Sequence, residues 1–395
     1  MRILFLHEVN YLTKPIFEMH EFPEHLARLG HEVGFVHFPE GYSQSQIRGL
    51  GWRTKISGRV VDSVELDLFT PWTFAGGLLG RLFAATVSYW QFRRVLREYR
   101  PDVVVSFSVP TSGWQALFAS RKVGVPYLFR ALDVSHKIRI GVFSSLVKAA
   151  ERFIYGNASW VSANNPAMLD YCVELGANAS RSSTDLPPLD LSHFAPSGES
   201  SGHLRNKLGL RDSDQVILYM GSFFYFSGLP EVIQSMVSAP ADCKLVLVGG
   251  WEQDAELRQQ VARLGLEKAV RFAGFVSFDE LPGYVKLADV AINAMHRSLV
   301  SNTAFPNKVI QYLASGVPVV STRLKGLEMT FAGSPALVFV DSSSEVVSAA
   351  NVVIRSTKQD GLKSAALNLV RDKFDVQGNL RAFESRIKGL VTIDR

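Results

Sequence analysis

Short apolar runs alternate with longer amphipathic segments along almost the whole chain. Runs such as Arg2–His7 and Asp102–Phe107 are typical of strands buried on both faces of a sheet. Between them, apolar residues recur every three or four positions, which predicts helices. Strands that alternate with helices at this spacing predict α/β domains with parallel, doubly wound sheets.

The same pattern gives the individual elements. In the first half, the predicted strands are Arg2–His7, Glu32–His37, Val64–Phe69, Asp102–Phe107, Pro126–Ala131 and Ser159–Ala163. The predicted helices of that half are Ile16–Leu29, Leu78–Tyr99, Ser112–Lys122, Phe143–Tyr155 and Pro166–Leu175. In the second half, the predicted strands are Gln215–Met220, Lys244–Val248, Val270–Phe272, Asp289–Asn293 and Val317–Ser321. The tail after Ser344 is predicted to be helical only.

Residues 181–214 interrupt the alternation, because they are rich in Ser, Pro and Gly and show little periodicity. We therefore predict a Rossmann-like domain over 1–190, a linker over 191–214 and a second Rossmann-like domain over 215–375. Residues 376–395 are predicted as a final helix that is a candidate for packing back on the first domain. Paired domains of this kind bind their ligand in the cleft where the carboxyl ends of their strands face each other.

Composition narrows the class of protein. The 395 residues are 47% hydrophobic and 20% charged, which is typical of a soluble globular protein. Cys172 and Cys243 are far apart and show no metal-ligand or disulfide spacing, so they argue against a metal site and fit a reducing cytoplasm. No run of eighteen uncharged apolar residues predicts a membrane-spanning helix. The phenylalanine-rich stretches Phe223–Phe226 and Phe272–Phe278 lack interleaved basic residues, which argues against a nucleic-acid partner.

The net charge of +5 is unevenly distributed. Between Arg81 and Arg152 there are twelve Lys or Arg residues and four acidic ones, so the local excess is +8 and predicts an anionic partner for the first domain. Within this region, the apolar stretch Phe74–Trp90 precedes four arginines, at 93, 94, 97 and 100. Two interpretations stay open: an amphipathic helix that contacts an anionic membrane surface, or a long core helix whose arginines are only solvated.

The most informative motif lies between residues 302 and 321. Pro306 and Asn307 open a predicted helix that stops at Gly316. Free N–H groups at the start of this helix, its dipole and the positive charge of Lys308 would together form a site for a phosphate or diphosphate. The alternative is an ordinary helix start with a solvated lysine.

Other candidate residues follow predicted strands of the first half. His7 and Glu8 end the first strand, where doubly wound folds bind ligands, and Tyr11 and Lys14 lie in the same loop. The alternative for this loop is an ordinary surface position. No GxGxxG pattern follows the strand, which disfavours a nicotinamide or flavin enzyme.

Asp133 follows a later strand of the first half. It is either a substrate-binding or acid/base carboxylate, or a helix-capping residue, since Val-Ser-His follows it.

The second half resembles the nucleotide-sugar-binding domain of glycosyltransferase family 4, which has the GT-B fold. The segments that carry this resemblance occur in the family's order: Val216–Gly228, Leu245–Gly250, Val270–Val276, Leu281–Ala294 and Pro306–Val320. Pro187–Phe194 stands where the family has Pro-Asn-Gly-Val-Asp followed by a phenylalanine. The likeness spans most of the chain and is weaker in the first half.

This resemblance implies a retaining, metal-independent glycosyltransferase that needs no cofactor and acts in bacterial surface polysaccharide synthesis. It implies a nucleoside diphosphate sugar donor and a glycan or lipid-linked saccharide acceptor, in the cytoplasm or on the inner face of the membrane. The implied donor-binding residues are Gly221, Ser222, Ser227, Gly249, Phe275, Val276, Pro306, Asn307, Lys308 and Gln311. The acceptor-binding candidates are His7, Glu8, Tyr11 and Lys14, and the catalytic candidates are Asp133 and Lys308.

The chain departs from the family's pattern where charge is expected. Ser222 and Ser227 stand at the positions of the family's arginine and lysine, and Thr303 and Gln311 at those of its paired glutamates. The stretch 130–133 lacks the histidine that many relatives have there. A hydroxyl can hydrogen-bond a phosphate but cannot neutralise it, and an amide lacks the charge of a carboxylate. These departures leave open a non-catalytic protein that binds a sugar nucleotide or scaffolds a partner glycosyltransferase.

Overall fold

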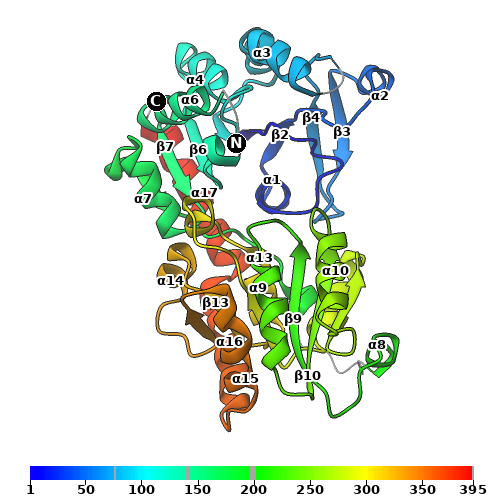
Figure 1. The fold of residues 1–395 in the computed structure, drawn as a ribbon. Coiled ribbons are helices and arrows are strands. Elements are labelled where there is room, and N and C mark those ends of the chain that lie inside the picture. Colours follow the sequence, from blue (N-terminus) through cyan, green and yellow to red (C-terminus); the bar gives the residue numbers. More distant parts are fainter. Residues whose placement is uncertain (75–76, 139–142, 196–201, 394–395) are drawn as a thin grey trace. The chain divides into compact units, whose positions relative to one another are not determined.

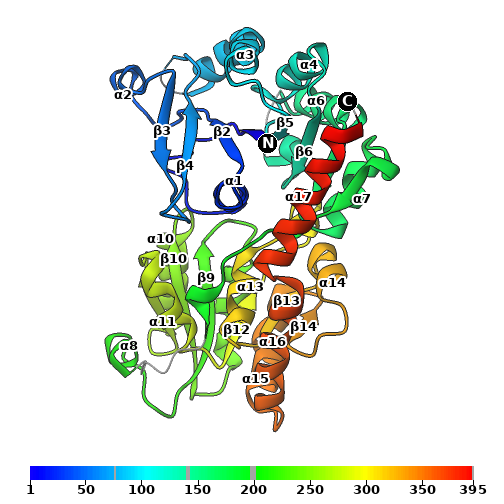
Figure 2. The same ribbon diagram turned by 180° about the vertical axis from the view of Figure 1, so that it is seen from behind.

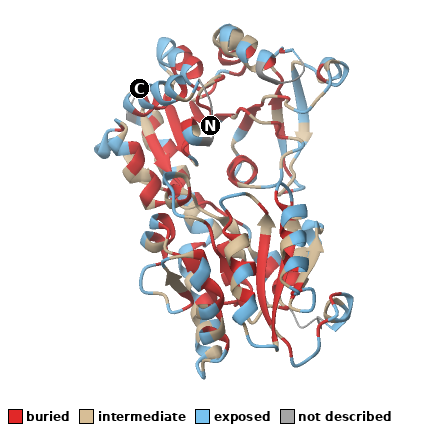
Figure 3. Ribbon diagram, in the orientation of Figure 1, coloured by how far each residue is buried: buried red, intermediate tan, exposed pale blue. Residues whose placement is uncertain are grey.

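The computed structural model describes residues 1–74, 77–138, 143–195 and 202–393 and forms two compact units (Figure 1). The first unit consists of Met1–Leu189 and Phe374–Arg395, and the second of Asp190–Lys373. Each unit has its own sheet covered by helices. Strand interiors are buried, whereas the outer faces of most helices are exposed (Figure 3). The predicted fold class of two Rossmann-like α/β domains is therefore confirmed.

The first sheet has eight strands in the order β3-β4-β2-β1-β5-β6-β7-β8. Their bounds are β1 Arg2–Leu6, β2 Glu32–Val36, β3 Arg53–Ser57, β4 Glu65–Phe69, β5 Val103–Ser106, β6 Tyr127–Ala131, β7 Trp160–Ala163 and β8 Ser182–Thr184. The pairs are parallel except that edge strand β3 runs antiparallel to β4. The order reverses at β1, which lies between β2 and β5, and such reversal points are where doubly wound sheets bind ligands.

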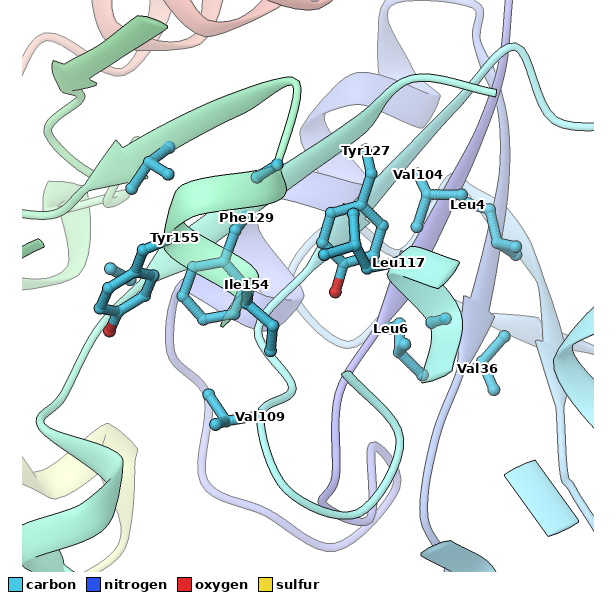
Figure 4. Close-up of a cluster of buried hydrophobic side chains, with 14 of the residues drawn as sticks. Leu4, Leu6, Val36, Val104, Val109, Leu117, Tyr127, Phe129, Ile154 and Tyr155 are labelled. Carbon is cyan, nitrogen blue, oxygen red and sulfur yellow. The ribbon is translucent and has the colours of Figure 1, made fainter. Parts of the chain in front are cut away.

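Helices cover both faces of this sheet. They are α1 Glu18–Arg28, α2 Gln44–Gly49, α3 Gly77–Tyr99, α4 Gly113–Lys122, α5 Ser135–Ile138, α6 Ser144–Asn157, α7 Pro166–Glu174 and α17 Val376–Ile393. The helices α1 and α17 cover one face (Figure 2). Alternate residues of a strand face opposite sides, so Phe5 packs with these two helices, whose Phe22 and Phe383 rings lie 4.2 Å apart. On the other face, Leu117 of α4 and Ile154 of α6 lie against the strands (Figure 4).

The second sheet has six parallel strands in the order β11-β10-β9-β12-β13-β14. They are β9 Gln215–Ser222, β10 Cys243–Gly250, β11 Val270–Gly274, β12 Val290–Asn293, β13 Val319–Thr322 and β14 Leu337–Val340. The helices are α8 Gly202–Lys207, α9 Leu229–Ser235, α10 Asp254–Arg263, α11 Leu281–Val285, α12 Leu299–Thr303, α13 Asn307–Ala314, α14 Lys325–Phe331, α15 Val346–Ile354 and α16 Gln359–Lys373. The order reverses at β9, between β10 and β12.

Every predicted strand is present, with each end within two residues of the prediction. Three strands were not predicted. β3 and β8 are polar and incompletely buried, so they lack the apolar run on which the prediction depends. The third, β14, was missed although its residues Leu337–Val340 form an apolar run, and it pairs with β13.

The segment predicted as a linker is partly structured. Residues 196–201 of it lie outside the described residues, but Phe194 is buried in the second unit and α8 follows. The carbonyl of Phe194 accepts a hydrogen bond from the Ser315 hydroxyl at 2.9 Å, and the His193 ring stacks on Phe278 at 4.9 Å. The structure therefore assigns Asp190–Lys373, which includes this segment, to the second unit.

Candidate functional site

In the second unit, the neighbouring strands β9 and β10 carry paired glycines near their carboxyl ends, beside the start of the helix α13. Gly221 and Gly249 are paired in register and have φ angles of 129° and 128°. These angles lie in the region that only glycine adopts without strain. A Cβ atom at Gly249 would also overlap with the carbonyl oxygen of Gly221. The two backbones thus approach each other more closely than side chains at these positions would allow.

Lys308, in the first turn of α13, extends to this glycine pair. Its ammonium lies 4.0 Å from the ring centroid of Tyr219, and 3.5 Å from where a Cβ of Gly221 would be. Among the ion pairs of the described residues, none joins Lys308 to a carboxylate within 4.0 Å. No side chain caps the helix at Pro306. A cation beside uncapped amides and a glycine backbone is an arrangement that binds phosphate.

Two tyrosines fix the lysine in place, and the sequence analysis did not identify either. The hydroxyl of Tyr312 accepts a hydrogen bond from the backbone N–H of Met220 at 2.7 Å. The hydroxyl of Tyr219 donates to the carbonyl of Ser222 at 2.9 Å. Because Lys308 and Tyr312 are four residues apart, they lie on one face of α13 and both contact the end of β9. That spacing is the signal in the sequence that could have revealed Tyr312.

The other residues considered for binding the sugar donor differ in their burial and in their hydrogen bonds. Ser227 is buried, and its hydroxyl has no hydrogen-bond partner in the described structure. Thr303 is buried and donates to the carbonyls of its own helix at 2.9 and 3.2 Å, so it does not replace a site glutamate. Ser222 and Gln311 are partly exposed. The residues at positions 222, 227, 303 and 311 are thus neutral, and they differ in exposure.

Aromatic side chains border the same edge. Phe275 follows β11 and is 71% exposed, and a Cβ on Gly250 would come within 2.9 Å of its ring. Val276 beside it is partly exposed. Trp251, which the sequence analysis missed, directly follows β10, has a φ of 108° and is 65% exposed. Flat apolar surfaces at the ends of β10 and β11 suit contact with a nucleobase.

The corresponding edge of the first unit is organised differently. Glu8 is 2% exposed, and its carboxylate accepts the backbone N–H groups of Thr111 and Ser112 at 2.7 and 3.0 Å, at the start of α4. Tyr11 is fully buried and donates to Glu24 at 2.6 Å. The prediction that Tyr11 contacts the sugar acceptor was wrong, because the side chain of Tyr11 has no exposed surface. Glu8 likewise stabilises the helix start.

His7 and Lys14 keep some exposure. The His7 ring stacks on Phe107 at 5.3 Å, and its Nδ1 accepts the backbone N–H of Glu8 at 2.9 Å. Lys14 forms an ion pair with Glu40 at 3.1 Å. These two residues stay the acceptor candidates of this loop.

Two charged residues lie near the end of β6: Arg130 is buried, and Asp133, just after the strand, is exposed. Arg130 is fully buried and donates to Glu18 at 2.5 and 2.8 Å, to the Ser162 hydroxyl and to the carbonyl of Asp185. Desolvation by the surrounding protein, and next the negative charge of Glu18, raise the pKa of Asp133 to about 6. The side chain of Asp133 is exposed to water, so the negative charge of Glu18 acts on a solvated carboxylate. The amide of Ser135 is bound by Glu151, at 2.7 Å, so Asp133 does not cap that group.

Two family models match the chain, one in each unit. The glycosyl transferase 4-like domain matches residues 19–183, and the model for glycosyl transferases group 1 matches residues 214–358. Together they account for most of the chain.

Individual relatives agree with these matches. The putative colanic acid biosynthesis glycosyl transferase WcaI of Escherichia coli is 25% identical over 93% of this chain and 95% of its own. The putative teichuronic acid biosynthesis glycosyltransferase TuaC of Bacillus subtilis is 24% identical over 64% of this chain and 61% of its own. Among solved structures, Anabaena HepE in complex with UDP has a TM-score of 0.77 at 19% identity, with 98% of this chain and all of HepE covered. This last likeness concerns the fold.

Proposed function

We propose that this chain, a GT-B glycosyltransferase whose two domains match the family 4-like and group 1 models, transfers a sugar from a nucleoside diphosphate sugar. The acceptor is a glycan or a lipid-linked saccharide. The observation that carries this proposal is Lys308, held beside the close backbones of Gly221 and Gly249 with no carboxylate partner among the described residues. Such a site offers its positive charge to a diphosphate.

A uridine diphosphate sugar is the first donor class to test. HepE, which shares the fold, has been crystallised with UDP and with UDP-glucose. The names of WcaI and TuaC refer to colanic and teichuronic acid, so we propose that the acceptor belongs to surface polysaccharide synthesis. Phe275 and Trp251 would contact the base, while Lys308 and the start of α13 would hold the diphosphate.

We propose a retaining transfer. The bond between the anomeric carbon and the diphosphate oxygen breaks, and an acceptor hydroxyl forms the new glycosidic bond on the same face. The hydroxyl's proton passes to the departing phosphate oxygen, so the step requires neither a protein base nor a metal. Lys308 stabilises the negative charge that develops on the diphosphate. Ser222 and Ser227 add hydrogen bonds without charge, so we expect a slower reaction than in relatives with Arg and Lys at these positions.

Asp133 is the proposed acceptor-binding carboxylate of the first unit, alongside His7 and Lys14. If it acts in its ionised form, activity should fall as the pH drops through about 6, where its carboxylate becomes protonated. Asp133→Asn should be slower at neutral pH and should lose this acidic limb of the rate profile. An unchanged profile in the variant would remove Asp133 from the proposal.

The deciding experiment combines binding and turnover. Thermal melting of the full chain with a panel of nucleoside diphosphate sugars should reveal stabilisation by at least one, since a ligand that binds only the folded state raises its melting temperature. Release of the nucleoside diphosphate from that donor, in the presence of lipid-linked saccharide extracts, then tests transfer. If a donor binds but no acceptor causes release of the nucleoside diphosphate, the second candidate is favoured, a non-catalytic protein that binds a sugar nucleotide. The neutral residues at positions 222, 227, 303 and 311 suggest this candidate. Binding to none of the panel would contradict both.

A further inference from the structure

A small cavity lies in the first unit, where the carboxyl ends of β1, β2 and β4 meet α3. Leu6 and Val36, register partners at the ends of β1 and β2, line it from the sheet (Figure 4). Trp72, which follows β4, and Ala84 and Phe92 of α3 complete an apolar wall. Among the described residues no helix, α3 included, could span a membrane, and this side of α3 faces the cavity. The strand order reverses at β1, so the cavity occupies the usual position of a ligand site in doubly wound folds.

Two side chains that line this cavity have a buried hydrogen-bonding atom without a partner among the described residues. One is the Oε1 atom of Gln91, whose side-chain N–H group donates to the carbonyl of Trp72 at 2.8 Å. The other is the Nδ1 atom of His37, which is 2% exposed and whose Nε2 atom lies 3.0 Å from the Thr70 hydroxyl. Buried polar atoms of folded proteins are hydrogen-bonded, so these two atoms indicate a group that enters the cavity and bonds them.

The size of the cavity limits this group. Its volume is about 40 Å³, and a single water needs about 10–15 Å³ by the same measure, so the cavity holds only a few heavy atoms. A whole sugar ring or a nucleobase is too large to enter it. A single substituent of a sugar ring is not.

The two unpartnered atoms decide which substituent fits. Gln91 Oε1 can only accept a hydrogen bond, so the group must carry a donor hydrogen. His37 Nδ1 donates or accepts according to its tautomer, and a hydroxyl suits both cases. A methyl group would leave both atoms without a partner, and a carboxylate would bring a negative charge next to an acceptor oxygen and an apolar wall. A hydroxymethyl group combines the required hydroxyl with one apolar carbon.

The residues around the cavity connect it to the proposed acceptor site. His7, an acceptor candidate, lines the cavity, as do Thr111 and Ser112 before the start of α4. Trp72 is 53% exposed. The part of its indole that faces water therefore offers an apolar surface to the sugar ring that carries the substituent.

We propose that this cavity is a specificity site for the saccharide acceptor and takes up the hydroxymethyl group of a hexose. The primary hydroxyl bonds Gln91 and His37, and the apolar wall contacts its carbon. The proposal rests on the proposed function, because it narrows the acceptor to a saccharide that presents a hexose. A 6-deoxyhexose or a hexuronate in this place is disfavoured.

Binding of simple glycosides to the full chain, measured without a donor, tests this proposal. Methyl glucoside, methyl galactoside and methyl mannoside, each with its 6-deoxy and its uronate counterpart, are titrated and followed by saturation-transfer NMR. At least one hexoside should bind about fivefold or more tightly than its 6-deoxy counterpart, which is the effect of losing one neutral hydrogen bond. The same hexoside should bind more tightly than its uronate, and its C6 protons should receive the strongest saturation.

Two variants and a matched control locate the effect. Gln91→Leu removes the acceptor oxygen but keeps a side chain of similar size, so it should bind the hexoside and its 6-deoxy counterpart equally. Ala84→Leu fills the cavity and should abolish binding of the hexoside. Thr86→Leu changes an exposed residue of the same helix that does not line the cavity, and should behave as the wild type.

Three outcomes would overturn the proposal. They are equal affinity of the wild type for each hexoside and its 6-deoxy counterpart, no binding of any glycoside, and an unchanged preference in Gln91→Leu. Each would mean that the cavity holds water only. The comparison of ligands on the wild type decides the matter even if a variant does not fold. Thermal stabilisation by a nucleoside diphosphate sugar, measured on the same preparations, reports on the second unit and so separates failure here from failure of the proposed function.

Discussion

The carboxyl edges of the two sheets use polar residues in opposite ways. In the first unit, Glu8 binds the amides of a helix start, Tyr11 binds Glu24, and Arg130 binds Glu18. Each of these groups is buried and is used within the fold. In the second unit, the same edge consists of glycine backbone and a lysine that no carboxylate of the described residues neutralises.

This difference shows that position at a strand end is not sufficient to identify a binding residue. A buried polar group must be hydrogen-bonded, and a buried charge must be paired. Where the protein itself provides the partner, the residue stabilises the fold, as Arg130 does. Where the described residues provide no carboxylate, as for Lys308, a ligand can act as the partner. Variants on the two edges should therefore affect different quantities.

The largest effect is expected for Arg130→Met, on stability. The substitution leaves Glu18 buried without its cation, and breaking a buried pair in this way costs about 3–5 kcal/mol. Chemical denaturation should show this loss for the first unit, while nucleotide binding by the second unit persists. The double variant Arg130→Met, Glu18→Gln should recover part of the loss. Full stability of the single variant would contradict the structural role of Arg130.

The next effect is expected for Lys308→Ala, on binding. A charge-assisted hydrogen bond to the diphosphate is worth about 1.5–3 kcal/mol, so the dissociation constant for the nucleoside diphosphate should rise by the corresponding factor. Titration calorimetry measures this change, and the unfolding free energy should hardly move. Lys268→Ala is the matched control, since Lys268 is exposed elsewhere in the second unit. Wild-type affinity in Lys308→Ala would remove the anion site from the proposed function.

A third prediction concerns how the stability of the first unit depends on pH. Burial lowers the pKa of His37, at the end of β2, to about 3. Below about pH 6.5 the unfolded chain binds a proton that the folded chain does not, so stability should fall as the pH drops below this value. His37→Gln should flatten this part of the stability profile, whereas His203→Gln, at an exposed position of α8, should not. Identical acid profiles for the wild type and His37→Gln would refute the assignment.

The smallest effect is expected for Gln311→Glu. A carboxylate accepts hydrogen bonds from ribose hydroxyls more strongly than an amide does, so donor affinity should change by less than about 1 kcal/mol and in the direction of tighter binding. The residue is partly exposed, and stability should be unaffected. A large loss of affinity would show that the amide of Gln311 donates a hydrogen bond to the nucleotide.

Much of the fold was determined by local pattern. Apolar runs such as residues 3–6 in β1 and 245–248 in β10 form strands, because a strand that is buried on both faces needs consecutive apolar side chains. Such runs are visible in the sequence. Pro306 and Gly316 bound α13 as predicted, since proline and glycine impose their own backbone limits. β3 could not be predicted in this way, because its pairing with β4, and not its composition, makes it a strand.

The functional site could be identified only from the tertiary structure. The sequence singled out Lys308 and Gly221, 87 positions apart, but only the packing of α13 against β9, through Tyr312 and Tyr219, brings the ammonium beside the glycine pair. The sequence likewise placed Tyr11 in the correct loop, yet its role depended on Glu24, which packing alone brings to its hydroxyl. Residue type and spacing determine which chemistry a side chain offers. Whether that chemistry is directed to the protein or to a ligand depends on which long-range partner the fold brings within hydrogen-bonding distance.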